Sequence, residues 1–491
     1  MKRTNRIYTK PYMFRIACIA LALSLVLTAC NEEELLNPVP ETSLGADFLF
    51  ANPERVLGQI NGMYAGVKNG SFLGGRNLML NDIRGEDFLN RTQNVFTGYD
   101  AWLHTVNSGS ADAVSTWGAA YTAINAANLL IDGLAAHPNA VNSVLAAQYI
   151  GEAKFVRALC YHYLTTMYGQ PYLKDNGASP AVPLRLKGES TTANNDLGLS
   201  TVAEVYTQIL KDLDEAELAL PLTYSTPLLN TTRAHRNTAI ALKTRVYLSM
   251  GNYAKVIAEA GKIVSDASPF KALTGVAHQL QPNIATIFSE NYTTVESVFS
   301  MPMTQLNNVG GQSGLATVYT STFEYNLNPS GIYGDPSWRA TDARKVNFTT
   351  AKIGNTTGPF ITKYKKVSPN LDYVPIIRYA EVLLNYAEAA AKTGSLPKAI
   401  ALLTAVRTRS DATYIFPAEA VATPEALVST IWIERRIELI GEGFRARDIM
   451  RSLLTFPAKG SGGLNAPAIS LSQPEYVFPI PNSERSTNKG L

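Results

Sequence analysis

Three carboxylates in one short stretch are the first residues with the chemistry of a catalytic site: Asp82, Glu86 and Asp87. An enzyme that cleaves a glycosidic bond uses two carboxyl groups, which need not be close in sequence. Acidic residues are also common in loops, so a surface hydrolase is the less favoured interpretation. The five histidines form no local metal-binding motif, and the chain has no Walker, GxGxxG or GxSxG motif. We expect no metal, no cofactor and no catalysis.

Two stretches combine aromatic and short polar residues, as a carbohydrate site requires. Aromatic rings offer an apolar platform for the C–H faces of sugars, while amide, carboxylate and guanidinium groups bind hydroxyls. The alternative is that these aromatics are buried and order the loops. Trp117 and Trp432 lie in helical motifs and are predicted to be core. The predicted ligand contacts are Asp82, Arg84, Tyr99, Trp102, Tyr325, Tyr333 and Trp338.

An acidic line near the end of the chain has helical spacing. Glu434, Glu438 and Glu442 follow one another at four-residue intervals, with arginines at positions 435, 436, 445 and 447. Opposite charges at this spacing support a helix surface. We interpret the line as a salt-bridged helix face that holds the last helices together, and not as a catalytic acid pair.

The first 29 residues have the three parts of an export signal. Five basic residues precede an apolar run from Ile16 to Leu27, which is about half of the ~20 residues needed to cross a bilayer. The run ends at Thr28, Ala29 and Cys30, which resembles the lipobox of bacterial lipoproteins. We therefore predict cleavage before Cys30 and attachment of diacylglycerol and an acyl chain such as palmitate. An ordinary secretory signal is the alternative.

Removal of this leader changes the electrostatic interpretation. Residues 1–29 carry five basic and no acidic residues, so cleavage lowers the net charge from +3 to about −2. No basic patch remains that would indicate nucleic-acid binding. Cys160 is then the one cysteine besides Cys30, and its apolar helical surroundings predict a small buried hydrophobe.

The remaining chain has helical periodicity broken by two loop-rich stretches. Apolar residues recur every three or four positions around 153–167, 202–220, 377–391 and 433–444. Helices ending near Gly251 and Gly394 are each followed by a similar second helix, as in tetratricopeptide hairpins. We predict a mainly α fold: a signal peptide at 1–29, a lipidated tether at 30–49, and one domain at 50–491. Loop-rich insertions are expected at about 70–118 and 266–375.

Five segments, in order, resemble the SusD/RagB family of nutrient-binding lipoproteins over nearly the whole chain. The acidic run Glu32–Glu34 after Cys30 resembles the signal that sends such lipoproteins to the cell surface. Near the C-terminus, YVFPIPN (476–482) resembles the family's closing segment, although the chain ends sooner than is usual. The five segments are WGAAYTAINAANLLID (117–132), GEAKFVRALCYHYLTTMYGQP (151–171), RAHRNTAIALKTRVYLSMGNY (233–253), PIIRYAEVLLNYAEA (375–389) and IWIERRIELIGEGFRARDIMR (431–451).

This resemblance implies a function without catalysis. Members of the family sit as a lid on a SusC-like TonB-dependent transporter of the outer membrane. They capture oligosaccharides, glycopeptides or peptides on a loop-rich face, while their helical repeats generally face the transporter. The resemblance therefore implies a lipid-anchored protein facing the cell exterior, most simply one that binds an oligosaccharide. It does not identify the ligand.

Overall fold

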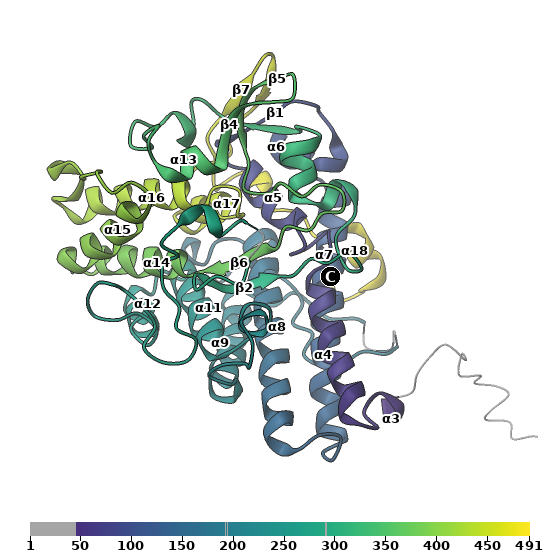
Figure 1. Ribbon diagram of the computed structural model, residues 1–491. Coiled ribbons are helices and arrows are strands. Elements are labelled where there is room, and N and C mark those ends of the chain that lie inside the picture. Colours follow the sequence, from purple (N-terminus) through teal and green to yellow (C-terminus); the bar gives the residue numbers. More distant parts are fainter. Residues whose placement is uncertain (1–45, 192, 194, 290–291) are drawn as a thin grey trace, which may run out of the picture.

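The computed structural model describes residues 46–491, except 192, 194, 290 and 291 (Figure 1). The predicted leader at 1–29, the lipidated Cys30 and the acidic run Glu32–Glu34 lie outside the described residues. Within the described part of the chain, no helix is both long and apolar enough to cross a membrane.

Long helices form the first half of the molecule. After the short α3 (Ala46–Leu49), α4 (Pro53–Val67) begins where the Asn52 side chain accepts a hydrogen bond from the Arg55 N–H at 3.0 Å. Next come α7 (Ala111–Ala136), α8 (Ser143–Tyr168) and α9 (Val202–Ala219). In sequence order, α4 packs on α7, α7 on α8 and α8 on α9 (Figure 1).

Helical hairpins follow, as the sequence predicts. One joins α11 (Arg236–Ser249) to α12 (Tyr253–Ala260), and the other joins α14 (Tyr379–Lys392) to α15 (Leu396–Ser410). Gly251 and Gly394 lie in the turns with φ of 67° and 85°, a left-handed conformation that glycine adopts without strain. The prediction of tetratricopeptide-like hairpins is confirmed. Helices α16 (Pro424–Leu439) and α17 (Arg445–Arg451) complete this part.

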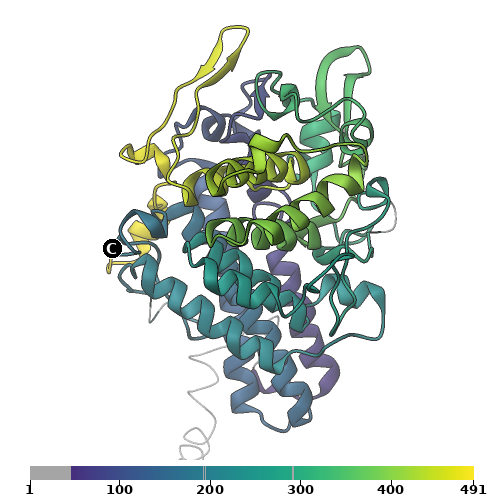
Figure 2. The same ribbon diagram turned by 90° about the vertical axis from the view of Figure 1, so that its left-hand side faces the viewer.

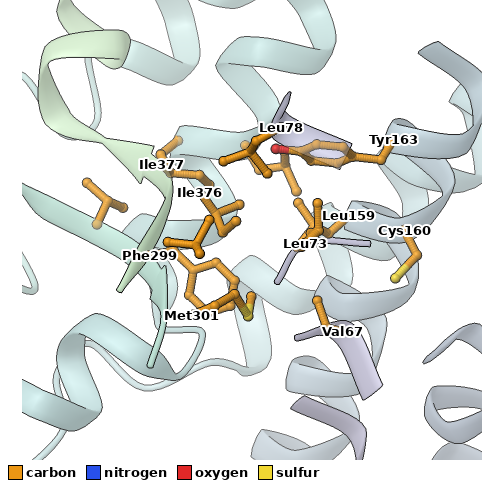
Figure 3. Close-up of a cluster of buried hydrophobic side chains, with 14 of the residues drawn as sticks. Val67, Leu73, Leu78, Leu159, Cys160, Tyr163, Phe299, Met301, Ile376 and Ile377 are labelled. Carbon is orange, nitrogen blue, oxygen red and sulfur yellow. The ribbon is translucent and has the colours of Figure 1, made fainter. Parts of the chain in front are cut away.

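A short antiparallel sheet connects the helices through the core. Strand β2 (Ser297–Met301) pairs with β6 (Val374–Arg378), and both strands are fully buried. Figure 3 shows Phe299, Met301 and Ile376 from these strands facing Val67 at the end of α4 and residues of α8. Cys160 lies in this cluster as predicted, and burial raises the pKa of its thiol.

The predicted insertions contain mostly short elements. They are α5 (Arg76–Ile83), β1 (Phe88–Asn90), α6 (Tyr99–Leu103), β3 (Tyr325–Leu327), α13 (Ala343–Phe348), β4 (Thr349–Ile353) and β5 (Thr356–Ile361). A hairpin of β7 (Lys459–Ser461) and β8 (Leu464–Ala466) and the small helices α10 (Pro227–Thr232) and α18 (Asn482–Thr487) lie elsewhere in the sequence. The strands β1, β4, β5 and β7 gather at the end of the molecule opposite α3 (Figure 1).

The acidic line at 434–442 is buried and fully paired. Glu434 binds Arg344 and Arg407, each at 2.5 Å. Glu438 contacts Arg344, Arg378 and Arg409 at 2.7–2.9 Å. The structural interpretation is confirmed, but the neighbouring arginines are not the partners, because these carboxylates point into the protein toward α13, β6 and α15. Glu442 lies beyond α16 and binds Lys363 and Arg378.

The two tryptophans predicted to be core differ in burial. Trp117 is 3% exposed, which confirms its prediction. Trp432 is half-buried and packs against the rim of the core, with Lys392 over its ring at 5.9 Å. Its contribution to stability is therefore expected to be smaller than that of a fully buried tryptophan.

Candidate ligand-binding cleft

The pairing of β1 with β3 brings the two predicted insertions together. Phe88 lies opposite Leu327, Leu89 opposite Asn326 and Asn90 opposite Tyr325 in an antiparallel register. Strand β5 packs beside β3, and β7 packs beside β1. The hairpins β4–β5 and β7–β8 project on two sides of the same end of the molecule (Figure 2).

A cleft of about 370 Å³ lies between these hairpins and is here called the hairpin cleft. Its floor comes from β1 and β3, and its sides come from the two hairpins. The lining residues are Asn90, Arg91, Asn326, Thr357, Gly358, Gly462 and Leu464.

Glycines shape both sides of the cleft. The turn between β4 and β5 contains Gly354 at φ 56°, and the turn between β7 and β8 consists of Gly462 and Gly463 at φ 59° and 92°. A two-residue turn with positive φ at both positions matches the twist of an antiparallel hairpin. Gly358 has φ 150°, and a β-carbon there would meet the Phe360 ring at 3.5 Å and the Arg91 guanidinium at 3.6 Å.

Arg91 supplies the charge of the hairpin cleft. Its backbone N–H donates to the Glu324 carbonyl at 2.9 Å, and its guanidinium lies over the Phe360 ring, 5.3 Å from the centroid. Among the described residues that line the cleft, Arg91 alone is charged. A guanidinium on an aromatic face, beside the side-chain amide of Asn326, can donate several hydrogen bonds to hydroxyl or carbonyl oxygens.

The loop that leaves β1 adds exposed apolar surface. Val95 is 50% exposed and Phe96 is 65% exposed, which is high for an aromatic side chain. The Asn94 side chain accepts from the Phe96 N–H at 3.0 Å, and the Arg76 guanidinium donates to the Phe96 carbonyl. The backbone is therefore fixed while the ring is left open to solvent.

Two predicted ligand contacts lie beneath this surface. Trp102 is completely buried, and its indole N–H donates to the Phe88 carbonyl at 2.9 Å. Tyr325 is completely buried, and its hydroxyl donates to the Thr97 carbonyl at 2.8 Å. As ligand contacts, both predictions are wrong. The buried rings and hydrogen bonds of these two side chains hold β1 and the following loop against the core. Long loops are commonly ordered by buried aromatic side chains of this kind.

Asp82 and Arg84 also belong to the interior, which contradicts the prediction. Asp82 is 2% exposed and accepts from the Gly443 and Phe444 N–H groups at 2.8 and 3.2 Å. Burial raises the pKa of Asp82 to about 7, against the opposing effect of these donors. Arg84 is 1% exposed, and it donates to the Tyr476 carbonyl at 2.7 Å. Burial lowers the pKa of Arg84 to about 10.

The remaining predicted aromatics form two separate pairs. Trp338 is 1% exposed, so its prediction as a ligand contact is also wrong. Tyr333 is half-buried against Trp338, at 6.1 Å between ring centroids, with Lys345 over both rings. Tyr99 is half-buried and stacks on Trp102 at 6.1 Å. The assignments of Tyr99 and Tyr333 stay predictions.

The carboxylates considered for catalysis are all held by donors. Glu86 binds Arg445 at 2.5 Å and Arg436 at 2.9 Å, and Asp87 binds Arg436 at 2.5 Å. With Asp82 engaged by backbone N–H groups, none of the three faces the hairpin cleft as part of an acid pair. Within the described residues, no three His, Cys, Asp or Glu side chains are grouped to hold a metal ion.

The two predicted insertions and the β7–β8 hairpin supply the lining of the hairpin cleft, but none of the seven predicted ligand contacts lines it. The cleft residues Asn90, Arg91, Asn326 and Thr357 are small or polar and carry no strong pattern. One usable signal was present, because a Gly-Gly pair at 462–463 is typical of a tight hairpin turn.

Comparisons with known proteins agree over nearly the whole chain. The model of the SusD family matches residues 285–491, and that of a family described as starch-binding associating with outer membrane matches residues 51–248. SusD-like protein P2 of Formosa agariphila is 28% identical over 530 aligned residues, which cover 97% of this chain and 98% of that protein.

Solved structures show the same architecture. A SusD superfamily protein from Bacteroides fragilis is 33% identical, with a TM-score of 0.82, over 90% of this chain and 99% of that one. A second, from Bacteroides thetaiotaomicron, is 25% identical, with a TM-score of 0.78, over 89% and 98%. A laminarin-binding SusD-like protein shares the fold at 21% identity and a TM-score of 0.67, over 89% and 98%.

Proposed function

Because the chain belongs to the SusD superfamily, we propose that it is a surface protein that binds a glycan in the hairpin cleft without cleaving it. The observation that carries this proposal is the cleft itself. It combines the Arg91 guanidinium, the Asn326 amide and the Thr357 hydroxyl with the apolar side chain of Leu464, and its described lining contains no carboxylate pair. These groups suit the hydroxyls and C–H faces of a sugar chain.

Two comparisons support a glycan as the ligand. One matching family model is described as starch-binding, and one protein of the same fold is described as laminarin-binding. Both descriptions concern neutral glucans. Arg91 can donate hydrogen bonds to neutral hydroxyls, and no other charged residue among the described lining competes for it.

Calorimetric titration of the mature protein with starch and laminarin oligosaccharides tests this proposal. Arg91→Ala is expected to weaken binding about tenfold, which corresponds to about 1.4 kcal/mol, without a change in melting temperature. Lys211→Ala removes an exposed cation on α9 and is the matched control. Equal affinity of both variants would reject the hairpin cleft as the site. Binding of peptides in place of glycans would reject the ligand class.

Release of reducing sugar in the same samples tests the proposal of binding without catalysis. The paired states of Glu86 and Asp87 predict no turnover. Hydrolysis that is abolished by Glu86→Gln would instead support the surface glycoside hydrolase considered from the sequence.

The membrane anchor and the transporter are further parts of this proposal. The lipobox-like sequence at Cys30 supports a lipoprotein of the outer membrane facing the exterior, and mass spectrometry of the mature N-terminus should find Cys30 acylated. A SusC-like TonB-dependent transporter is the proposed partner. Gentle detergent extraction followed by affinity capture should recover such a barrel, and recovery of this protein alone would contradict the partnership.

A further inference from the structure

A second concave site lies away from the hairpin cleft, between α7, residues 185–191 with Asn195, and α18. Its volume of about 430 Å³ exceeds that of the hairpin cleft. Figure 1 shows α18 beside α7. The residues that define this site, here called the α7–α18 pocket, are Trp117, Gly118, Tyr121, Arg185, Glu189 and Glu484.

Hydrogen bonds hold the walls of the α7–α18 pocket in place. The Asn125 side chain pairs with both the N–H and the carbonyl of Glu189 at 2.8 Å. Asn128 donates to the carbonyls of Arg185 and Lys187 at 2.9 and 3.1 Å. On the other side, the completely buried Asn488 exchanges two 2.8 Å bonds with the backbone of Leu197. The pocket is thus formed before any ligand arrives, as binding sites usually are.

Polar side chains surround the half-buried ring of Tyr121 in this pocket, while Trp117 is only 3% exposed and packs against that ring. Trp117 and Tyr121 lie with ring centroids 5.0 Å apart, and the Trp117 indole N–H donates to Glu484 at 3.1 Å. Arg185 sits between Glu189 at 3.1 Å and Glu484 at 3.3 Å. The Glu189 side chain remains 24% exposed and can accept further hydrogen bonds.

The α7–α18 pocket differs from the hairpin cleft in net charge. Its described lining has one cation, Arg185, and two carboxylates, Glu189 and Glu484, so it carries a net charge of about −1. Such a site attracts amines, accepts hydrogen bonds from neutral hydroxyls and repels carboxylate or sulfate groups.

We propose that the α7–α18 pocket binds one neutral or amine-bearing saccharide unit, at a site independent of the hairpin cleft. The half-buried ring of Tyr121 receives the C–H face of the sugar, and Glu189 accepts from its hydroxyl or ammonium group. Uronic acids and sulfated sugars are excluded by charge. This assignment goes beyond the proposed function, because it does not require that the hairpin cleft bind anything.

Gly118 allows the pocket to be filled without damage to the fold. It lies on the exposed side of α7, and no atom lies within 4 Å of the position that a β-carbon would take. Gly118→Leu therefore places a side chain in the pocket while it removes the cost of glycine in a helix. Gly58→Leu on α4 is the matched control, since that position is also helical, exposed and open.

Saturation-transfer NMR with glucose, galactose, N-acetylglucosamine, glucosamine and glucuronic acid, each alone at millimolar concentration, provides the test. At least one neutral or amine-bearing sugar should receive saturation from the wild type, and glucuronic acid should not. Gly118→Leu should reduce that signal at least fivefold, whereas Gly58→Leu should retain it. If Gly118→Leu fails to fold, Glu189→Ala takes its place with the same expected loss.

The outcomes separate this inference from the proposed function. Absence of any signal in the wild type, equal signals in Gly118→Leu and Gly58→Leu, or binding of glucuronic acid that Gly118→Leu abolishes would each overturn the pocket assignment. A signal lost in Arg91→Ala but kept in Gly118→Leu would support the hairpin cleft and reject the α7–α18 pocket.

Discussion

The buried charges around α16 and the open hairpin cleft contain similar kinds of side chains with opposite roles. Glu438 is 1% exposed and touches three arginines, so none of its bonding capacity faces solvent. Arg91 is exposed and rests on one aromatic ring. Whether a polar group supports the fold or meets a ligand is therefore decided by its partners, not by its residue type.

The same contrast applies to the aromatic residues of one loop. Trp102 is completely buried and bonded to the Phe88 carbonyl, whereas Phe96, six positions earlier, is 65% exposed. Both belong to the loop-rich stretch at about 70–118, which the sequence predicts to supply aromatic contacts for a sugar. Variants at these positions can therefore test whether buried residues control stability while exposed residues control ligand affinity.

The largest effect is expected for Glu438→Ala. Although burial opposes ionisation, Arg409, Arg378 and Arg344 hold the pKa of this carboxyl well below its ordinary value. Removal of the carboxylate takes one partner from each of three buried arginines, which keep their other carboxylates, and should lower the free energy of unfolding by about 4–5 kcal/mol. Urea denaturation measures this loss. Glu425→Ala, at an exposed position of the same helix, should cost less than about 1 kcal/mol. Similar losses in both variants would contradict the distinction.

The second largest effect is expected for Trp102→Ala, which should lower the free energy of unfolding by about 3–4 kcal/mol. The substitution opens a cavity under β1 and leaves the Phe88 carbonyl without the indole donor. Thermal unfolding and glycan titration together check this. We expect a lower melting temperature and nearly normal affinity in the folded fraction. An unchanged melting temperature with lost binding would restore Trp102 as a ligand contact.

Gly463→Val tests the shape of the hairpin cleft. A β-branched residue at φ 92° is strained by about 1–2 kcal/mol, and the strain is confined to the β7–β8 turn. Global stability should hardly change, while glycan affinity should fall about fivefold, since this turn forms one side of the cleft. Gly310→Val, at an exposed glycine with negative φ, serves as the control and should leave affinity unchanged. Equal affinity of the two variants would mean that the hairpin does not shape the site.

The smallest effect is expected for Phe96→Ala. The ring makes few contacts with the protein, so its loss should not lower the melting temperature. Phe96 does not line the hairpin cleft, so a bound glycan must extend beyond the cleft to reach this ring; in that case affinity should fall about threefold, equivalent to about 0.7 kcal/mol. Titration measures this difference, and unchanged affinity would limit the site to the cleft between the hairpins.

The scaffold was largely predictable from sequence, whereas the residues that line the hairpin cleft were not. Helical periodicity and the glycines at 251 and 394 identify the hairpins because both signals are local. The exposure of Phe96 and the burial of Trp102 depend on the pairing of β1 with β3, whose residues are more than 230 positions apart. No local pattern encodes that pairing. The partners of Glu438, supplied by α13, β6 and α15, were missed for the same reason.

Helix α3 lies at the end of the molecule opposite the hairpin cleft (Figure 1), and the chain before it limits the distance between α3 and Cys30. Sixteen residue steps separate Cys30 from Ala46, and a fully extended chain of that length spans at most about 55 Å. A lipid at Cys30 would therefore keep α3 within that distance of the bilayer, whatever the orientation of the rest of the molecule.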